Sequence, residues 1–448
     1  RQMCIRDRHF AYFPHTEKDI NEMLERISLS SLEDLYSDVP SDFIYKGEYD
    51  LPEAMSEEEL RRFFGELAKK SPKKKVFVGQ GAYDHYTPSV IEYICSRSEF
   101  LTAYTPYQAE ISQGTLRYIF EYQSMICELT GMDVSNASMY DGATAAAEAM
   151  RLCVSSCRGR NRVLVSESLL PNIVETLKTY AHFAGIELAF IPVEDGETSH
   201  RALEEMLGAD VAGVIVPSVN RFGVVEDHEG FSALIHEAGA YMVEYCDPST
   251  LAVVKTPGEW GADVAVGDGQ SLGIPLCYGG PYVGFMACRS ELMRKLPGRV
   301  VGQTLDKEGR RAYVLTLQAR EQHIRREKAT SNICSNQSLM ALWVTVYLSL
   351  MGPRGMKRVN DLSFEGAHLL KKELLETGLF EDVLSDKPFI KEFVLKPLCD
   401  VTALQEALSD AGYFAALQTA EGYVTFCVTE KYTEDDIKGL VEVVKSLK

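Results

Sequence analysis

The stretch YMVEYCDPSTLAVVKTPGEWGADVAVGDGQSLG, residues 241–273, contains two short apolar runs, at 241–245 and 262–267, that have the length of buried β-strands. Outward from this stretch, apolar runs of the same kind recur at 162–166, 186–193, 212–218 and 282–287. Segments with helical periodicity separate them, including 171–185 and 231–240. This alternation predicts an α/β fold built on a large, doubly wound and mainly parallel sheet with helices on both faces.

The chain on either side of this sheet predicts three parts. Residues 1–75 are expected to form a helical arm. Residues 76–330 are expected to form the large α/β domain, and residues 331–448 to supply linking helices and a small C-terminal α+β domain. The sequence therefore predicts one large domain with a helical arm before it and a small domain after it.

Local signals predict where several helices begin or end. Ser56 with Glu59, and Thr433 with Asp436, have the spacing of capping boxes at helix starts. Gly352 is expected to end a long apolar helix in the third part of the chain.

The composition excludes several classes of partner. The chain has 46 Lys plus Arg against 65 Asp plus Glu, a formal net charge of -19, so neither nucleic acid nor an anionic membrane is an expected partner. No apolar run approaches the roughly 20 residues of a spanning helix. The cysteines form no Cys-x-x-Cys pair, so no metal site is predicted. Residues 1–8 have no apolar segment and are interpreted as a stray extension rather than a signal, so a cytoplasmic location is expected.

The predicted layout is typical of fold-type I pyridoxal-phosphate enzymes. Such a site needs a helix N-terminus for the phosphate, a carboxylate for the pyridine nitrogen and a lysine for the Schiff base. Asp141-Gly142-Ala143-Thr144 lies between a predicted strand at 138–140 and an Ala-rich helix, so the backbone N–H groups near Thr144 are candidates for the phosphate. The alternative is a simple N-cap by Asp141, whose charge repels a phosphate.

Asp247 is the candidate for the pyridine nitrogen. It follows the predicted strand at 241–245, and ligands of open α/β sheets bind at the carboxyl ends of the strands. The alternative is a turn formed by Asp247-Pro248-Ser249.

The lysine is missing where it is expected, shortly after the strand at 262–267. The residues there are Asp268, Gly269, Gln270 and Ser271, and none of them can form an imine. Lys255 and Lys295 are interpreted as surface lysines. The sequence therefore predicts a fold of this class that has lost its own cofactor chemistry.

Long segments of the chain resemble the P-protein family of the glycine cleavage system, glycine dehydrogenase (decarboxylating), and specifically its alpha subunit, which is equivalent to the N-terminal half of the long form. The resemblance runs from Tyr12 to the C-terminus. The segments that carry it are YDHYTPSV at 83–90 and YTPYQAEISQG at 104–114, with longer matches at 121–145, 261–285 and 297–337.

The resemblance implies an oxidoreductase built from alpha and beta subunits, of which only the beta type carries the Schiff-base lysine and the pyridoxal phosphate. It places Gln270 at the position of that lysine, so Thr144, Asp247 and Gln270 belong to a degenerate pocket that binds no cofactor covalently. The implied reaction decarboxylates glycine and passes the aminomethyl group to the lipoyl arm of the H-protein. An assembly of two alpha and two beta subunits is expected.

Two segments are candidates for contacts with partners. The first supplies possible contributors to the beta subunit's site, Tyr104, Thr105, Tyr107 and Gln108, with Glu110 and Ser112. Its alternative is a structural loop in which Ser112 caps the following helix. The second is the cationic segment 320–328, which is expected either to attract the acidic H-protein or to join subunits, with internal ion pairs to Glu321 and Glu327 as the alternative.

Two other functions remain as alternatives. One is a self-sufficient pyridoxal-phosphate lyase or aminotransferase, against which Gln270 argues. The other is a non-catalytic scaffold with a regulatory role.

Overall fold

The computed structural model describes residues 14–47, 49–329, 331–334 and 337–447. The interpretation of residues 1–8 lies outside these ranges. The chain divides into one unit that ends at Pro72 and a second that begins at Lys73, and each is described by itself. Within the described ranges, no helix combines the length and the apolar character that crossing a membrane requires.

The second unit is built around a central sheet that has seven strands in the described part of the chain. Its strands, in spatial order, are β2 (Val134–Ser135), β10 (Gly284–Cys288), β9 (Val264–Asp268), β8 (Tyr241–Tyr245), β7 (Val211–Pro217), β3 (Arg162–Ser166) and β4 (Glu187–Ile191). The five strands from β9 to β4 are parallel, whereas β10 is antiparallel to both of its neighbours. The predicted mainly parallel sheet is therefore confirmed. The predicted strand at 138–140 is wrong, because Met139 forms only an isolated bridge to Gly284.

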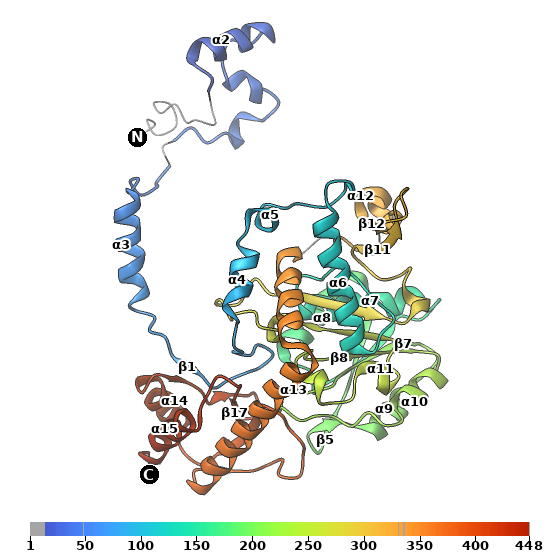
Figure 1. The fold of residues 1–448 in the computed structure, drawn as a ribbon, viewed down its shortest axis with the longest axis vertical. Coiled ribbons are helices and arrows are strands. Elements are labelled where there is room, and N and C mark those ends of the chain that lie inside the picture. The colour runs from blue at the N-terminus through green and yellow to red at the C-terminus, as the bar shows by residue number, and fades with distance from the viewer. Residues whose placement is uncertain (1–13, 48, 330, 335–336, 448) are drawn as a thin grey trace. The chain divides into compact units, whose positions relative to one another are not determined.

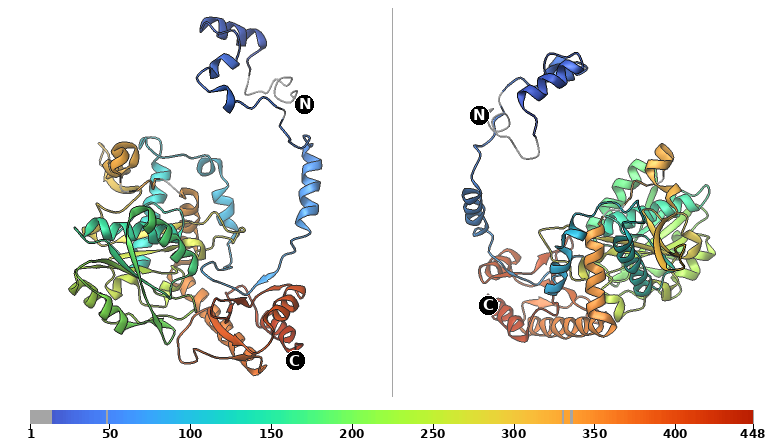
Figure 2. Two further views of the ribbon diagram at one scale, coloured as in Figure 1. Left: turned by 180° about the vertical axis from the view of Figure 1, so that it is seen from behind. Right: turned by 45° about the horizontal axis from the view of Figure 1, so that its top comes forward.

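Helices cover both faces of this sheet (Figures 1 and 2). Successive strand residues face opposite ways: Leu164 and Met242 belong to one core cluster, and Val165 and Val243 to the other. The first core includes residues of α6 (Gln113–Thr130), α9 (His200–Met206), α10 (Phe231–Glu237) and α13 (Ser338–Glu376). The second includes residues of α7 (Gly142–Ser156) and α8 (Pro171–Ala184). Both faces of the sheet are thus buried, as its nearly continuous apolar strands predict.

A long kinked helix connects this sheet to a smaller one. α13 changes direction at Gly352, which has the non-helical backbone angles φ 56° and ψ -178°, so the predicted helix end is a kink. The smaller sheet has the order β13 (Phe380–Glu381), β14 (Glu392–Pro397), β17 (Val424–Cys427) and β16 (Leu417–Gln418). It has its own core, to which α14 (Val401–Asp410) and α15 (Glu434–Lys445) contribute. Strands β11 (Val300–Leu305) and β12 (Arg311–Thr316) form an antiparallel hairpin, which contributes Val301 and Tyr313 to the first core of the central sheet. This hairpin was not predicted from the sequence.

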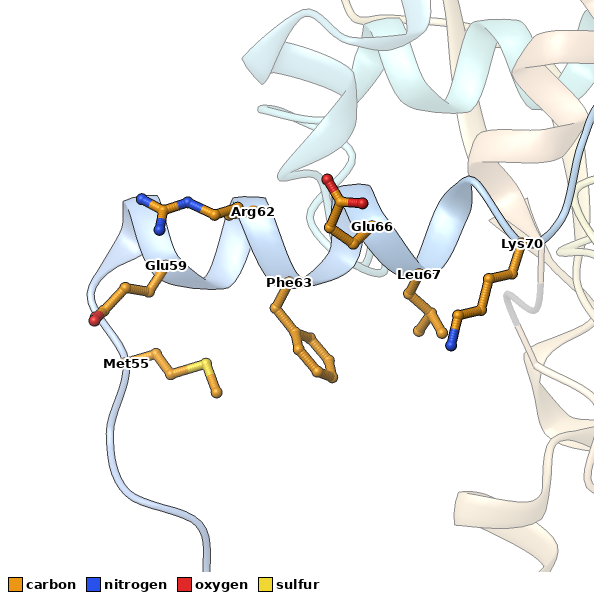
Figure 3. Close-up of a pocket in the computed structure, with 7 residues that line it drawn as sticks. All are labelled: Met55, Glu59, Arg62, Phe63, Glu66, Leu67 and Lys70. Carbon is orange, nitrogen blue, oxygen red and sulfur yellow. The ribbon is translucent and has the colours of Figure 1, made fainter.

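The first unit contains the helices α2 (Glu17–Arg26) and α3 (Glu57–Ala68). The predicted capping box of Ser56 and Glu59 is confirmed at the start of α3. No residue of α3 is buried, and Phe63 is 52% exposed. Figure 3 shows Phe63 and Leu67 projecting from α3 on the side where Met55 lies. The helix therefore has an apolar face that other described residues leave uncovered.

Glu244 is an unusual residue of the central sheet, because it is a carboxylic acid that is 0% exposed on β8. Among the described residues, neither of its carboxyl oxygens has a hydrogen-bond partner. Nδ1 of the buried His228 lies 4.0 Å from Oε2 of Glu244, and Nε2 of His228 lies 3.4 Å from Oε2 of Glu226. Burial, and to a lesser degree the charge of Glu226, raises the pKa of Glu244 to about 7 even though His228 acts in the opposite direction.

Replacing Glu244 by Gln is expected to change how stability depends on pH. A carboxyl whose pKa is raised on folding contributes its full stability below about pH 4.5 and loses it as the pH rises through about 7. Glu244→Gln is therefore expected to gain on the order of 2–3 kcal/mol relative to the wild type between pH 5 and pH 8.5. Urea denaturation at both pH values measures this difference, and identical pH dependence in the two proteins would contradict the expectation.

Candidate functional site

The predicted pocket positions meet at one edge of the central sheet. Asp247 follows β8, Gln270 follows β9, and Thr144 lies in the first turn of α7. Asp268, the last residue of β9, joins them because it accepts a hydrogen bond from the backbone N–H of Gly142 over 3.0 Å. Beside them is a cavity of about 370 Å³, whose lining includes Gln80, Asp141, Thr144, Asn172, Tyr245, Asp268 and Tyr282.

The N-terminus of α7 is occupied by two carboxylates of the protein itself. Asp141 accepts a hydrogen bond from the backbone N–H of Thr144 over 2.7 Å, which confirms the alternative interpretation of Asp141 as a simple N-cap. Asp268 accepts from Gly142 over 3.0 Å and from the backbone N–H of Gln270 over 2.9 Å. Burial, with the nearby charges of Asp141 and Asp247, raises the pKa of Asp268 to about 7. Two of the backbone donors at the start of α7, those of Gly142 and Thr144, are therefore already bonded to acidic side chains, which disfavours a phosphate there.

Asp247 is paired with a lysine of the small sheet. Nζ of Lys391, the residue before β14, lies 2.6 Å from Oδ2 of Asp247, and this lysine side chain is 5% exposed. The backbone N–H of Ser249 donates to Oδ1 of Asp247 over 3.0 Å, so the predicted turn is also present, and the hydroxyl of Ser271 donates to the same oxygen. Burial raises the pKa of Asp247, but the charge and hydrogen bond of Lys391 outweigh this effect and hold the pKa below its ordinary value.

Lys391 has three further contacts. Its Nζ lies 3.0 Å from Nε2 of His85, donates to Oγ of Ser249 over 2.8 Å and lies 3.8 Å from the ring centroid of Tyr83. Burial and the charge of Lys391 lower the pKa of His85, so the neutral ring accepts from Lys391 at Nε2. Its Nδ1 then donates to Glu430 over 2.6 Å. These contacts hold the ammonium group of Lys391 from several sides. The sequence analysis did not predict Lys391 as a residue of the site.

Gln270 forms a buried clamp on the chain segment that contains Tyr83. Its amide nitrogen donates to the backbone oxygens of Tyr83 and Ile274, each over 2.8 Å. Its amide oxygen accepts from the backbone N–H of Tyr83 over 2.7 Å. Gln270 is 0% exposed, so every hydrogen bond that it forms here stabilises the fold around the pocket.

The residues present do not fit pyridoxal phosphate. Lys391 already supplies the positive partner of Asp247 that a protonated pyridine nitrogen would supply. Asp141 and Asp268 bond to backbone N–H groups where the sequence predicted a phosphate, and Gln270, at the predicted lysine position, has an amide that cannot form an imine. At the three predicted positions, the chain's own side chains therefore take contacts that the cofactor would need.

The predicted loop at 104–112 lies at the surface. Tyr104 is 91% exposed and Tyr107 is 53% exposed. Nη2 of Arg299 donates to the hydroxyl of Tyr107 over 2.7 Å, and the Arg299 guanidinium lies 4.6 Å from the centroid of the Tyr107 ring. Gln108 and Glu110 are exposed, and Thr105 is half-buried. The expected cap by Ser112 is wrong, because its side chain makes no cap hydrogen bond to α6.

The cationic segment 320–328 combines internal pairs with exposed charges. Oε2 of the buried Glu321 lies 3.2 Å from Arg299, which confirms an internal ion pair of Glu321, and 3.4 Å from Nδ1 of His323. Glu327 is exposed and forms no ion pair among the described residues, so this part of the expectation is wrong. Arg325 and Lys328 are exposed.

The family model described as glycine cleavage system P-protein matches residues 10–444. The probable glycine dehydrogenase (decarboxylating) subunit 1 of Moorella thermoacetica is 48% identical over 97% of this chain and 99% of its own length. The corresponding protein of Carboxydothermus hydrogenoformans is 48% identical over 97% and 99% of the two chains.

Solved structures agree with these relatives. The crystal structure of a glycine decarboxylase (P-protein) of the glycine cleavage system, in inhibitor-bound form, matches with a TM-score of 0.91 and 43% identity over 98% of this chain and 100% of that one. A sphingosine-1-phosphate lyase of Burkholderia pseudomallei K96243 matches with a TM-score of 0.67 at 13% identity over 91% and 95% of the two chains, a likeness of fold alone.

Because Lys391 and Asp247 are paired in a buried position, removal of only one partner is expected to lower the free energy of unfolding strongly. Lys391→Met leaves a buried carboxylate without its counter-charge and is expected to destabilise the protein by about 3–5 kcal/mol. Adding Asp247→Asn to Lys391→Met is expected to recover much of that loss. Urea denaturation of the wild type, both single variants and the double variant gives the coupling free energy.

Lys396→Met on the same strand is the matched control. Lys396 pairs with Glu381 over 2.8 Å, but the two side chains are 51% and 54% exposed. Loss of this exposed pair is therefore expected to lower the free energy of unfolding by less than about 1 kcal/mol. An effect of Lys391→Met no larger than that of the control would contradict a structural role for the buried pair.

Proposed function

Since the chain belongs to the glycine cleavage system P-protein family, we propose that it is the subunit of a two-subunit glycine dehydrogenase (decarboxylating) that does not carry the cofactor. In this proposal the pyridoxal phosphate is bound by a homologous beta subunit, which supplies the electron sink for loss of carbon dioxide from glycine. The aminomethyl group then passes to the lipoyl arm of the H-protein. The assembly contains two alpha and two beta subunits and works in the cytoplasm.

One observation carries this proposal: Lys391 occupies the partner position of Asp247 in a chain that otherwise has the family's fold. A member of a cofactor-dependent family whose own cofactor position is filled by its own side chain needs a second chain for chemistry. The relatives' names, which specify a subunit 1, support the existence of a second subunit.

This chain's part in the reaction is to complete and shape the partner's site. The loop at 104–108 presents Tyr104 and Gln108 to solvent, where another subunit can accept them. Tyr107 is held by Arg299, which also pairs with Glu321, so the loop is fixed to the large domain. In the proposal, these side chains donate hydrogen bonds at the edge of the partner's site and help to exclude water from it.

The alternatives explain fewer of these observations. A self-sufficient pyridoxal-phosphate lyase or aminotransferase requires a lysine at position 270 and a free carboxylate at Asp247, and the chain has neither. A purely regulatory scaffold is distinguished from the proposed subunit by its effect on turnover, because only the proposed subunit completes the active site.

The chain by itself is expected to form no covalent link with pyridoxal phosphate. Incubation with the cofactor, reduction with borohydride and peptide mass spectrometry should find no modified lysine at the pocket, including Lys391. After co-expression with the beta subunit, the same treatment should modify a lysine of the partner, and glycine decarboxylation with lipoylated H-protein should appear. Reduction of the cofactor onto Lys391 in this chain would refute the proposal.

Variants of the exposed loop test whether it enters the partner's site. Tyr104→Phe and Gln108→Ala are expected to lower turnover of the assembled complex by on the order of a hundredfold, without changing assembly, because each removes a hydrogen-bonding group. Phe183→Ala, at a side chain that is 84% exposed on α8, is the control and should change neither property. Turnover per assembled complex is measured together with the dissociation constant of the subunits. Normal turnover with weakened assembly would leave the loop only a packing role.

A further inference from the structure

A second cavity, lined by basic residues, lies in a different part of the large domain. Its volume is about 150 Å³, and its walls come from the segments 294–298, 320–325 and 331–333. Four cationic side chains line it, those of Arg294, Lys295, Arg320 and Arg325. Such a concentration of positive charge is notable in a protein whose formal net charge is -19. None of the residues that line it also lines the cavity beside Asp268.

Arg320 carries a donor that the protein leaves unused. Its Nε donates to the backbone oxygen of Leu317 over 3.1 Å, and its Nη2 donates to that of Gly298 over 2.9 Å. These two bonds fix the plane of the guanidinium. Its Nη1 is buried and has no hydrogen-bond partner among the described residues. A buried donor without an acceptor is unfavourable, the more so when it is charged, so an acceptor at this position would be strongly favoured.

Within the described part of the chain, the one carboxylate that lines the cavity is already paired. The carboxylate in the lining is that of Glu321, and its Oε2 already pairs with Arg299 over 3.2 Å and with His323 over 3.4 Å. Lys295 donates to the backbone oxygen of Ser155 over 3.0 Å, which holds this cation in place without neutralising it. The cavity therefore keeps a net positive potential toward any ligand that enters it.

From this geometry we infer that the cavity is a binding site for an oxyanion, either inorganic phosphate or a carboxylate group. A guanidinium presents parallel N–H donors that match the oxygens of phosphate and carboxylate, and Arg320 has a fixed plane and an unused Nη1. Since a water molecule takes up about 30 Å³ in the liquid, the cavity of about 150 Å³ admits a group of phosphate or carboxylate size with a few waters.

Calorimetric titration of the full-length chain tests this site, with inorganic phosphate in one arm and succinate in the other, both in a buffer free of other oxyanions. Saturable binding of phosphate or succinate is expected, and the tighter of the two identifies the source of the oxyanion. Arg320→Met is expected to weaken binding at least tenfold, because it removes the fixed guanidinium. Arg117→Met, at an exposed arginine paired with Glu121 on α6, is the control and should bind like the wild type.

Arg325→Gln provides a second test if Arg320→Met folds poorly, because Arg325 is exposed and lines the same cavity. It is expected to weaken binding severalfold and to preserve the fold, which circular dichroism checks. Absence of saturable binding in both arms would overturn the inference. So would an equal loss of affinity in Arg117→Met and Arg325→Gln, which would indicate a general charge effect.

Discussion

The buried ion pair between Asp247 and Lys391 is the interaction on which the rest of the site depends. It joins the carboxyl end of β8 in the central sheet to the start of β14 in the small sheet. Both side chains are almost fully buried, so each charge is tolerable only because the other is present. The hydroxyls of Ser249 and Ser271 and the ring of His85 complete the shell around the two charges. The pair therefore links the two sheets, and under the proposed function it takes the place of a contact between Asp247 and the nitrogen of a cofactor.

Under the proposed function, this pair accounts for a chain that has the fold of the P-protein family but does not carry the cofactor. At the N-terminus of α7, the side chains of Asp141 and Asp268 likewise accept hydrogen bonds from backbone N–H groups that a phosphate could otherwise use. Gln270 uses its whole amide to hold the segment around Tyr83. Three other features of the described chain can contact other molecules: the 104–108 loop, the uncovered face of α3 and the basic cavity around Arg320.

Most strands of the central sheet could be predicted from the sequence, because local residue patterns encode them. The strands β3 and β8 coincide with the predicted apolar runs, because a strand buried on both faces is recognisable from its own residues. The pairing of Lys391 was not predicted, since it depends on residues that only the tertiary fold brings together. Its one local signal is the charged pair Lys391-Glu392 inside an otherwise apolar run, because buried charges in strands require partners. The Ser112 cap failed because φ -114° and ψ 20° differ from the extended conformation that an N-cap usually adopts.

The proposed division between the two subunits can be tested by a crystal structure of this chain together with its beta subunit, grown with saturating pyridoxal phosphate. We expect density for the cofactor in the beta subunit and Nζ of Lys391 within hydrogen-bond distance of Asp247 in this chain. A cofactor ring whose pyridine nitrogen contacts Asp247, with Lys391 displaced from it, would contradict the account.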